Sequence, residues 1–274
     1  MTGPTGSPVR IAVLGAGGRM GQSLIRAIAN DAGFELAGAL GSPGSATLGQ
    51  DAGLLAGLAR RLGVLVASDR ADVLARAQVA LDFTLPEATL ANLAACEARG
   101  VALLLGTTGL SDPARAALPA AAARIALLVA ANTSLGVAVL AGLIERAARA
   151  LPADYDIDVL DVHHRDKRDA PSGTALGLGA AAAAGRGREV ALLTADAADG
   201  GGAPRRPGAI GFASLRAGDI VGEHTVYFAG PGERLELTHR ATDRMAFARG
   251  ALKAAAWLRG RAPGRYSMAD VLGL

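Results

Sequence analysis

The sequence has one cysteine, few aromatic residues and almost no lysine. Because Cys96 has no partner, an intrachain disulfide is excluded, and the helical pattern of residues 92–99 predicts a buried, unreactive thiol. Aromatic residues make up only 3% of the chain, so the core must consist of Ala, Leu, Val and Ile, which suits a layered α/β protein. Of 28 basic residues only Lys167 and Lys253 are lysines, so a lysine within a motif is informative here.

Strong charge and long apolar segments are also lacking. The net charge of +3 is too small and too dispersed to indicate nucleic-acid binding. The first ten residues contain no apolar signal-peptide core, so we expect a cytoplasmic protein. Residues 125–144 carry no charge, but Asn132-Thr133-Ser134 and Gly136 interrupt them. We therefore predict a buried strand, a turn and a helix of a soluble protein, not a membrane span.

Short apolar runs alternate with helical patterns through the first half of the chain. Because the apolar runs are continuous and alternate with helices, they indicate a parallel sheet covered on both faces. Residues 41–57, rich in Gly, Ser and Pro, are predicted to form a loop. The predicted strands are 9–14, 34–40, 64–67, 79–83, 101–105 and 125–130, and the predicted helices are 19–30, 69–77, 86–100 and 112–123.

The pattern changes after about Ser134. We predict helices at 134–150, from near Ser172 and at 245–259, a strand at 156–163, and a flexible glycine-rich loop at 199–207. The β-rich runs 210–216, 223–229 and 234–240, separated by short turns, suit an antiparallel meander.

The expected architecture is α/β. A Rossmann-like parallel-sheet domain spans residues 1–133 and is completed by 244–274, and a second α/β domain with an open mixed sheet spans 134–243. Open sheet edges invite pairing between subunits, so a homo-oligomer is expected.

A glycine-rich segment, GAGGRMG (15–21), follows the first predicted strand and opens a helix. Glycines there let backbone N–H groups approach a pyrophosphate at the positive end of the helix. The segment departs from GxGxxG because Met20 occupies the third glycine position, and a plain strand–helix turn is the alternative. No acidic residue stands at Gly41 or Ser42, where NAD-specific sites place one, so NADPH or weak discrimination is favoured.

Three predicted strands end in small or polar residues: Asp82-Phe83-Thr84, Gly106-Thr107-Thr108 and Ala131-Asn132-Thr133-Ser134. Ligands of doubly wound sheets bind beyond the carboxyl ends of the strands, so these ends could hold the ribose and nicotinamide. Ordinary helix capping is the alternative for any one position. Three such ends together favour a ligand crevice.

The densest chemistry lies in HHRDKRDAPSGT (163–174), which holds two of the four histidines and one of the two lysines. A solvated charged loop is the alternative. However, the segment precedes a helix start at Ser172-Gly173-Thr174, whose N–H groups and neighbouring cations suit a dianionic substrate. Adjacent residues His163 and His164 point to opposite faces of a strand, and no further Cys or His cluster is visible, so no metal site is predicted.

The chain resembles the 4-hydroxy-tetrahydrodipicolinate reductase family, also called dihydrodipicolinate reductase, along nearly its whole length. The matching stretches are GAGGRMG (15–21), DFT (82–84), GTTG (106–109), AAN (130–132), HHRDKRDAPSGTA (163–175), RAGDIVGEHTV (216–226) and GERLELTHRA (232–241). The resemblance implies an oxidoreductase of lysine and diaminopimelate biosynthesis that reduces a cyclic enimine dicarboxylate with NADH or NADPH and loses water. It also implies a homotetramer joined through the second-domain sheets.

Roles follow from the resemblance by position. It implies His163 as general acid/base and Lys167 as proton donor. Substrate contacts are implied for His164, Ser172, Gly173, Thr174 and Arg244. Cofactor contacts are implied for Gly15, Ala16, Gly17, Gly18, Arg19, Met20, Phe83, Thr84, Gly106, Thr107, Thr108, Ala130, Ala131, Asn132 and Thr133.

The sequence departs from the family pattern at two places. Family members often carry an acidic and then a basic residue where Gly41 and Ser42 stand, and an aromatic residue where Thr133 stands. Two other hypotheses remain: a related amino-acid dehydrogenase, which should lack the 163–174 motif, and a non-catalytic dinucleotide sensor, against which the intact His163 and Lys167 argue.

Overall fold

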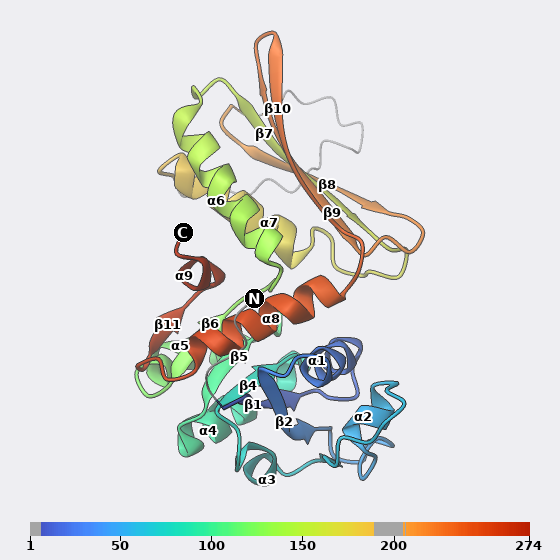
Figure 1. The fold of residues 1–274 in the computed structure, drawn as a ribbon. Coiled ribbons are helices and arrows are strands. Elements are labelled where there is room, and N and C mark those ends of the chain that lie inside the picture. Colours follow the sequence, from blue (N-terminus) through green and yellow to red (C-terminus); the bar gives the residue numbers. More distant parts are fainter. Residues whose placement is uncertain (1–6, 189–204, 206) are drawn as a thin grey trace. The chain divides into compact units, whose positions relative to one another are not determined.

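A computed structural model describes residues 7–188, 205 and 207–274 of the chain. The chain forms two compact units (Figure 1), one combining Met1–Ser134 with Met245–Gly273 and the other spanning Leu135–Arg244. The flexible loop predicted for residues 199–207 lies outside the described residues except for Arg205 and Pro207.

The first unit is built on a seven-stranded sheet whose strand pairs are all parallel. The predicted Rossmann-like sheet is therefore confirmed. The third strand is shorter than expected, and β11 was not predicted because its three residues contain no apolar run. In sheet order the strands are β11 (Gly264–Tyr266), β6 (Ala126–Val129), β5 (Ala102–Leu105), β4 (Val79–Asp82), β1 (Val9–Leu14), β2 (Phe34–Leu40) and β3 (Val66–Ala67).

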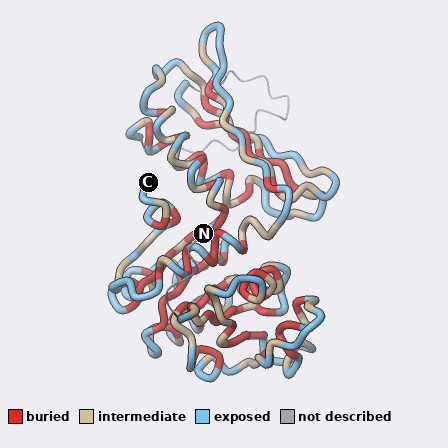
Figure 2. The backbone as a smooth tube through the Cα atoms, viewed as in Figure 1, coloured by how far each residue is buried: buried red, intermediate tan, exposed pale blue. Residues whose placement is uncertain are grey.

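Helices cover both faces of this sheet, which explains why its central strands are apolar throughout. One layer comprises α3 (Arg70–Leu74), α4 (Thr89–Arg99) and α5 (Asp112–Ala122), which share a core cluster with the sheet. The other contains α1 (Arg19–Ala29) and α8 (Met245–Leu258), which pack together, and α8 also contacts β1, β4 and β5. Figure 2 colours most of the sheet as buried. Short helices are η1 (Pro86–Ala88) and α9 (Met268–Leu272).

The predicted burial of Cys96 in a helix is confirmed, because Cys96 lies on α4 and is fully buried. Burial, helped by the nearby Asp82 and Glu97 carboxylates, raises the pKa of its thiol to about 12. The thiol therefore stays protonated and unreactive at neutral pH.

The prediction of an unbroken loop at 41–57 is wrong, because this segment contains a short helix, α2 (Ala52–Leu55). Asp51 stabilises it by accepting hydrogen bonds from the N–H groups of Gly53 and Leu54, and it also accepts bonds from Leu62 and Gly63. Burial alone would raise the pKa of Asp51, but these four backbone donors outweigh it and lower the pKa. Long-range contacts to Leu62 and Gly63 are not visible in the local sequence pattern.

The segment 125–144 forms β6 and the first part of α6 (Leu135–Ala150), as predicted. Within the described residues, no helix combines the length and the apolar character that crossing a bilayer requires.

The second unit contains a four-stranded mixed sheet in the order β10-β9-β7-β8. Its strands are β7 (Asp156–His163), β8 (Ile210–Arg216), β9 (Gly222–Gly230) and β10 (Glu233–Ala241). One face packs against α6 and α7 (Gly173–Gly185) through a cluster that includes Val159, Leu178, Phe212 and Phe228. The predicted open mixed sheet is confirmed.

The predicted meander, however, is wrong. Only β9 and β10 form a hairpin, whereas β7 lies between β9 and β8 and pairs with β8 in parallel. β7 carries the fully buried Val159 and Asp161, and its backbone groups need partners on both edges. The Gly218-Asp219 turn therefore joins two strands that are not neighbours.

Candidate active site

The glycine-rich segment joins β1 to α1 in a turn that only glycine allows at two points. Gly15 has a φ of +88°, and a Cβ there would lie 2.9 Å from the Phe83 carbonyl oxygen. A Cβ at Gly21 would lie 2.2 Å from the Gly15 carbonyl oxygen. Gly21 thus lets α1 pack closely on the turn, the role that the third glycine of the motif usually has. The displaced glycine therefore keeps this packing role one position later in the sequence.

The outer part of this turn is open to a ligand. The N–H groups of Gly15 and Ala16 donate to the carbonyl of Leu40, at 3.0 and 2.8 Å, and so fix the turn to the end of β2. Gly17, Gly18 and Arg19 are exposed, and Met20 is half-buried. Gly18 is the N-cap of α1, so this helix starts without a side-chain cap. An uncapped helix start with exposed glycine backbone suits a phosphate group.

The end of β4 lies beside this turn, the end of β5 lies next to that of β4, and Asp82 braces both. This buried carboxylate accepts hydrogen bonds from the Thr84 N–H and hydroxyl, at 2.9 and 2.6 Å, and the Thr107 hydroxyl donates to the Thr84 carbonyl at 3.1 Å. The Phe83 ring lies against Gly106, where a Cβ would come within 2.3 Å of it. Hydrogen bonds between the strand ends, not helix capping, therefore occupy the Thr84 and Thr107 hydroxyls. Thr108, next along the chain, is exposed.

The end of β6 is held in a different way. Thr133 is 2% exposed, and its hydroxyl donates to the Phe247 carbonyl of α8 at 2.8 Å. The Asn132 side chain accepts a hydrogen bond from the Ser134 N–H at 2.8 Å. Ala130 is buried and Ala131 is exposed. The Thr133 hydroxyl thus links the end of β6 to α8 within the first unit. Only the backbone of Thr133 is left to contact a ligand.

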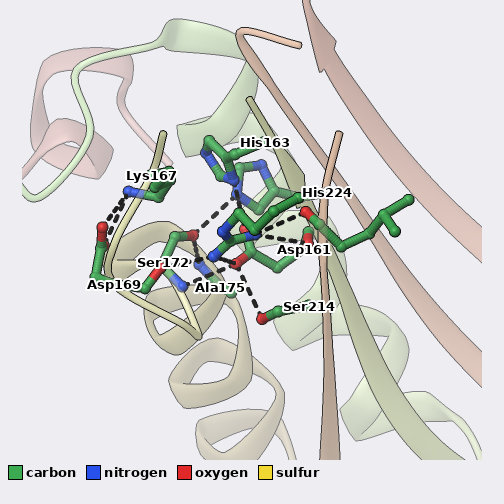
Figure 3. A network of polar contacts seen from close by, with 10 residues as sticks. Asp161, His163, Lys167, Asp169, Ser172, Ala175, Ser214 and His224 are labelled. Atoms are coloured by element: carbon green, nitrogen blue, oxygen red, sulfur yellow. Dashed lines mark hydrogen bonds and ion pairs between the residues drawn. The ribbon is translucent and has the colours of Figure 1, made fainter. Parts of the chain in front are cut away.

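In the second unit, three strands bring a polar cluster together around Asp161 (Figure 3). Asp161 and His163 lie on the same face of β7, and His224 stands opposite Asp161 on β9. Oδ1 of Asp161 lies 2.8 Å from Nδ1 of His163 and 3.3 Å from Nε2 of His224. Oδ2 accepts hydrogen bonds from the Arg216 guanidinium and the Ser172 N–H, both at 2.9 Å.

The cluster keeps Asp161 ionised although it is fully buried. Burial by itself would raise the pKa of Asp161, but the contacts with His163 and His224 and the bonds from Arg216 and Ser172 hold it well below its usual value. A buried carboxylate needs such compensation, because an unpaired charge in the interior is costly.

Lys167 lies on the loop that follows β7 and is held by Asp169. Its Nζ is 2.8 Å from both carboxylate oxygens of Asp169, and its side chain is only 21% exposed. Burial would raise the pKa of Asp169, but Lys167 lowers it overall. Arg216 also donates to the Asp169 carbonyl at 2.6 Å, so one guanidinium joins the lysine loop to Asp161.

The helix α7 begins directly after this loop. Ser172 is its N-cap: its hydroxyl accepts from the Ala175 N–H at 3.1 Å and lies 3.2 Å from Nε2 of His224. Gly173 and Thr174 are half-buried in the first turn. Of the remaining predicted substrate residues, His164 follows His163 at the end of β7, and Arg244 ends the segment Leu135–Arg244 of the second unit.

Sequence reasoning missed three members of the cluster: Asp161, Arg216 and His224. The sequence shows no further Cys or His cluster near His163, but the fold brings one carboxylate and a second imidazole to it. The ligand atoms of Asp161, His163 and His224 lie within 4.8 Å of one another and could hold a metal ion. Arg216 already supplies a positive charge to Asp161, so we assign an ion-pair cluster. A signal for Arg216 and His224 existed, since both lie in the family-like stretch at 216–226.

A parallel sheet covered by helices on both faces, with a glycine-rich turn after its first strand, is the Rossmann-type architecture found in nicotinamide-dependent oxidoreductases. Two family models divide the chain: "Dihydrodipicolinate reductase, N-terminus" matches residues 9–133, and "Dihydrodipicolinate reductase, C-terminus" matches residues 136–272. The chain belongs to the dihydrodipicolinate reductase family.

Individual relatives agree with this assignment. Proteins of Rhodopseudomonas palustris and Afipia carboxidovorans named 4-hydroxy-tetrahydrodipicolinate reductase are 53% and 52% identical, each over 98% of both chains. A solved structure of dipicolinate-bound dihydrodipicolinate reductase from Paenisporosarcina sp. TG-14 is similar in fold, with a TM-score of 0.74 and 22% identity over 96% of this chain and 98% of that one. The predicted family and the predicted reductase activity in lysine biosynthesis are thereby confirmed.

Proposed function

We propose that this chain reduces 4-hydroxy-tetrahydrodipicolinate to tetrahydrodipicolinate with NADPH or NADH, using the residue roles set out below. The observation that carries the proposal is the HHRDKRDAPSGT segment, which the fold attaches to the buried Asp161 cluster. We further propose that residues 1–133 with 244–274 act as the dinucleotide-binding domain and residues 134–243 as the substrate-binding and oligomerisation domain.

The first unit fits a dinucleotide. Exposed glycine backbone at an uncapped helix start suits the pyrophosphate, and Arg19 is exposed beside it. When bound, the reduced nicotinamide supplies the hydride. The residues proposed to hold the dinucleotide are Gly15, Ala16, Gly17, Gly18, Arg19, Met20, Phe83, Thr84, Gly106, Thr107, Thr108, Ala130, Ala131, Asn132 and Thr133. For Thr84, Thr107 and Thr133 the proposed contacts are through the backbone, because their hydroxyls have internal partners.

The second unit fits a small dicarboxylate. The backbone N–H groups of Gly173 and Thr174 at the start of α7, with Ser172 as its N-cap, are proposed to face one carboxylate. His164 and Arg244 are proposed to add positive charge or hydrogen bonds for the substrate.

The proton chemistry is assigned to His163 and Lys167. Reduction adds a hydride and a proton to the conjugated imine system of the ring, and water leaves. Lys167, poised on a loop by Asp169, is proposed to donate the proton. His163, anchored at Asp161, is proposed to act as general acid/base at the reacting ring.

Cofactor preference depends on the end of β2, where Gly41 is buried and Ser42 is exposed and no acidic residue stands. We propose that NADPH is used at least as well as NADH, because nothing negative at this position repels a 2′-phosphate. The test is kcat/KM for both dinucleotides in Ser42→Glu, with Ser42→Gln as a control of matched size.

The introduced carboxylate should lower kcat/KM for NADPH by about tenfold, as expected for about 1.4 kcal/mol of repulsion, and affect NADH much less. Equal losses with both dinucleotides would show that Ser42 does not face the 2′-position.

We also propose a cytoplasmic homotetramer. The sheet face opposite α6 and α7 carries Leu215, whose side chain is 52% exposed, and β8 and β10 are edge strands. A sheet face that no described helix covers, with open edges, favours pairing with other copies of the chain.

A further inference from the structure

We propose that Asp161 is a positioning residue that fixes the imidazole of His163 for proton transfer, with Gly222 keeping the far side of the ring clear. This inference rests on the proposed role of His163 as general acid/base.

The carboxylate of Asp161 is itself held in place. Its Oδ2 accepts hydrogen bonds from Arg216 on β8, from the Ser172 N–H at the start of α7, and from the Ser214 hydroxyl at 3.3 Å. Its Oδ1 is then left to face the two imidazoles, 2.8 Å from Nδ1 of His163. Because the three donors come from two different elements, the carboxylate cannot rotate without losing several of them.

Two further groups flank the ring of His163, whose side chain is 11% exposed. The His224 ring meets it edge-on, with centroids 5.2 Å apart and planes at 72°. At Gly222 on β9, a Cβ would lie 3.0 Å from Nε2 and 3.3 Å from Cδ2 of His163. The space beside Nε2 therefore exists because residue 222 has no side chain.

This arrangement assigns different tasks to the two ring nitrogens. A carboxylate beside Nδ1 favours the tautomer with the proton on that nitrogen and stabilises the imidazolium once it forms. Nε2 is then the nitrogen that exchanges a proton with the substrate. The Arg216 charge balances that of Asp161, so protonation of His163 adds one positive charge to the cluster.

The experiment is a double-mutant cycle on the full chain, with kcat and KM measured for Asp161→Asn, His163→Gln and the double variant. We expect Asp161→Asn to lower kcat on the order of a hundredfold, as for a misplaced general acid, with KM for the dinucleotide within about twofold. On the His163→Gln background the same change should cost less than about threefold, because Asp161 acts through His163. Asp161→Glu, which keeps the charge, should recover part of kcat.

Asp158→Asn is the matched control, since Asp158 lies on the same strand but pairs with Arg205 on the other face. It should leave kcat unchanged. Gly222→Ala adds only a methyl beside Nε2 and should lower kcat by at least about tenfold without changing KM for the dinucleotide.

Each outcome is decisive. The inference is overturned if Asp161→Asn folds and keeps a kcat within about twofold of wild type. It is also overturned if Asp161→Asn lowers kcat as much on the His163→Gln background as it does in the wild-type protein. If Asp161→Asn does not fold, the Gly222→Ala variant provides the test. A wild-type kcat in Gly222→Ala then overturns the inference. Wild-type kcat in His163→Gln instead overturns the role proposed for His163 itself, which separates that failure from this one.

Discussion

At the scale of single residues, the proposed chemistry depends on a lysine in a chain that has only two. Lys167→Ala should lower turnover by about a hundredfold or more, because a general acid contributes that much to proton transfer. Dinucleotide binding, measured by fluorescence of the reduced nicotinamide, should be largely retained. Lys253→Ala, which removes an exposed lysine of α8, is the control. Wild-type turnover in Lys167→Ala would exclude Lys167 as the proton donor.

Residues of the site could be predicted from the sequence where they lie close together in one motif. His163 and Lys167 stand four positions apart in a motif dense in charge, so their proximity needs no knowledge of the fold. Asp161, Arg216 and His224 come together only through the register of β7 with β8 and β9. Because that register depends on long-range packing, the sequence alone could not bring these three to His163.

At the scale of elements, the turn between β1 and α1 depends on Gly21. Gly21→Ala would place a methyl 2.2 Å from a backbone oxygen, so it should destabilise the protein by about 1–3 kcal/mol. It should also weaken dinucleotide binding, because α1 must move away from the turn.

Gly177→Ala is the control, because a Cβ in that exposed turn of α7 would meet nothing within 4 Å. It should stabilise the helix by up to about 1 kcal/mol. Denaturant unfolding measures both variants, and equal stability of the two would contradict the close packing at Gly21.

Elements with continuous apolar runs and clear breaks were predicted close to their observed bounds, as for β1 and α4. The failures share a physical cause: the contacts that decided them are distant in sequence. Asp51 caps α2 while binding Leu62 and Gly63, and β7 separates β8 from β9 although a short turn joins those two strands. Turn chemistry predicts a change of chain direction but not which strands become neighbours.

At the scale of the whole molecule, the face of the second sheet that no described helix covers predicts assembly. Leu215→Arg should reduce the sedimentation mass from that of a tetramer to that of a smaller species, because a charge would be buried at the proposed interface. Leu54→Arg, at a leucine 46% exposed on α2, should leave the mass unchanged. A tetramer that persists in Leu215→Arg would place the interface elsewhere.

The central claim is that this chain reduces the cyclic dicarboxylate with a nicotinamide dinucleotide. The most direct measurement follows the absorbance of NADPH and NADH in parallel, with the substrate generated in place from pyruvate and aspartate semialdehyde by the preceding synthase. We predict rapid oxidation of the dinucleotide that depends on the synthase products, at least as fast with NADPH as with NADH. No oxidation of either, by folded protein that still binds dinucleotide, would contradict the claim and favour another dehydrogenase or a dinucleotide sensor.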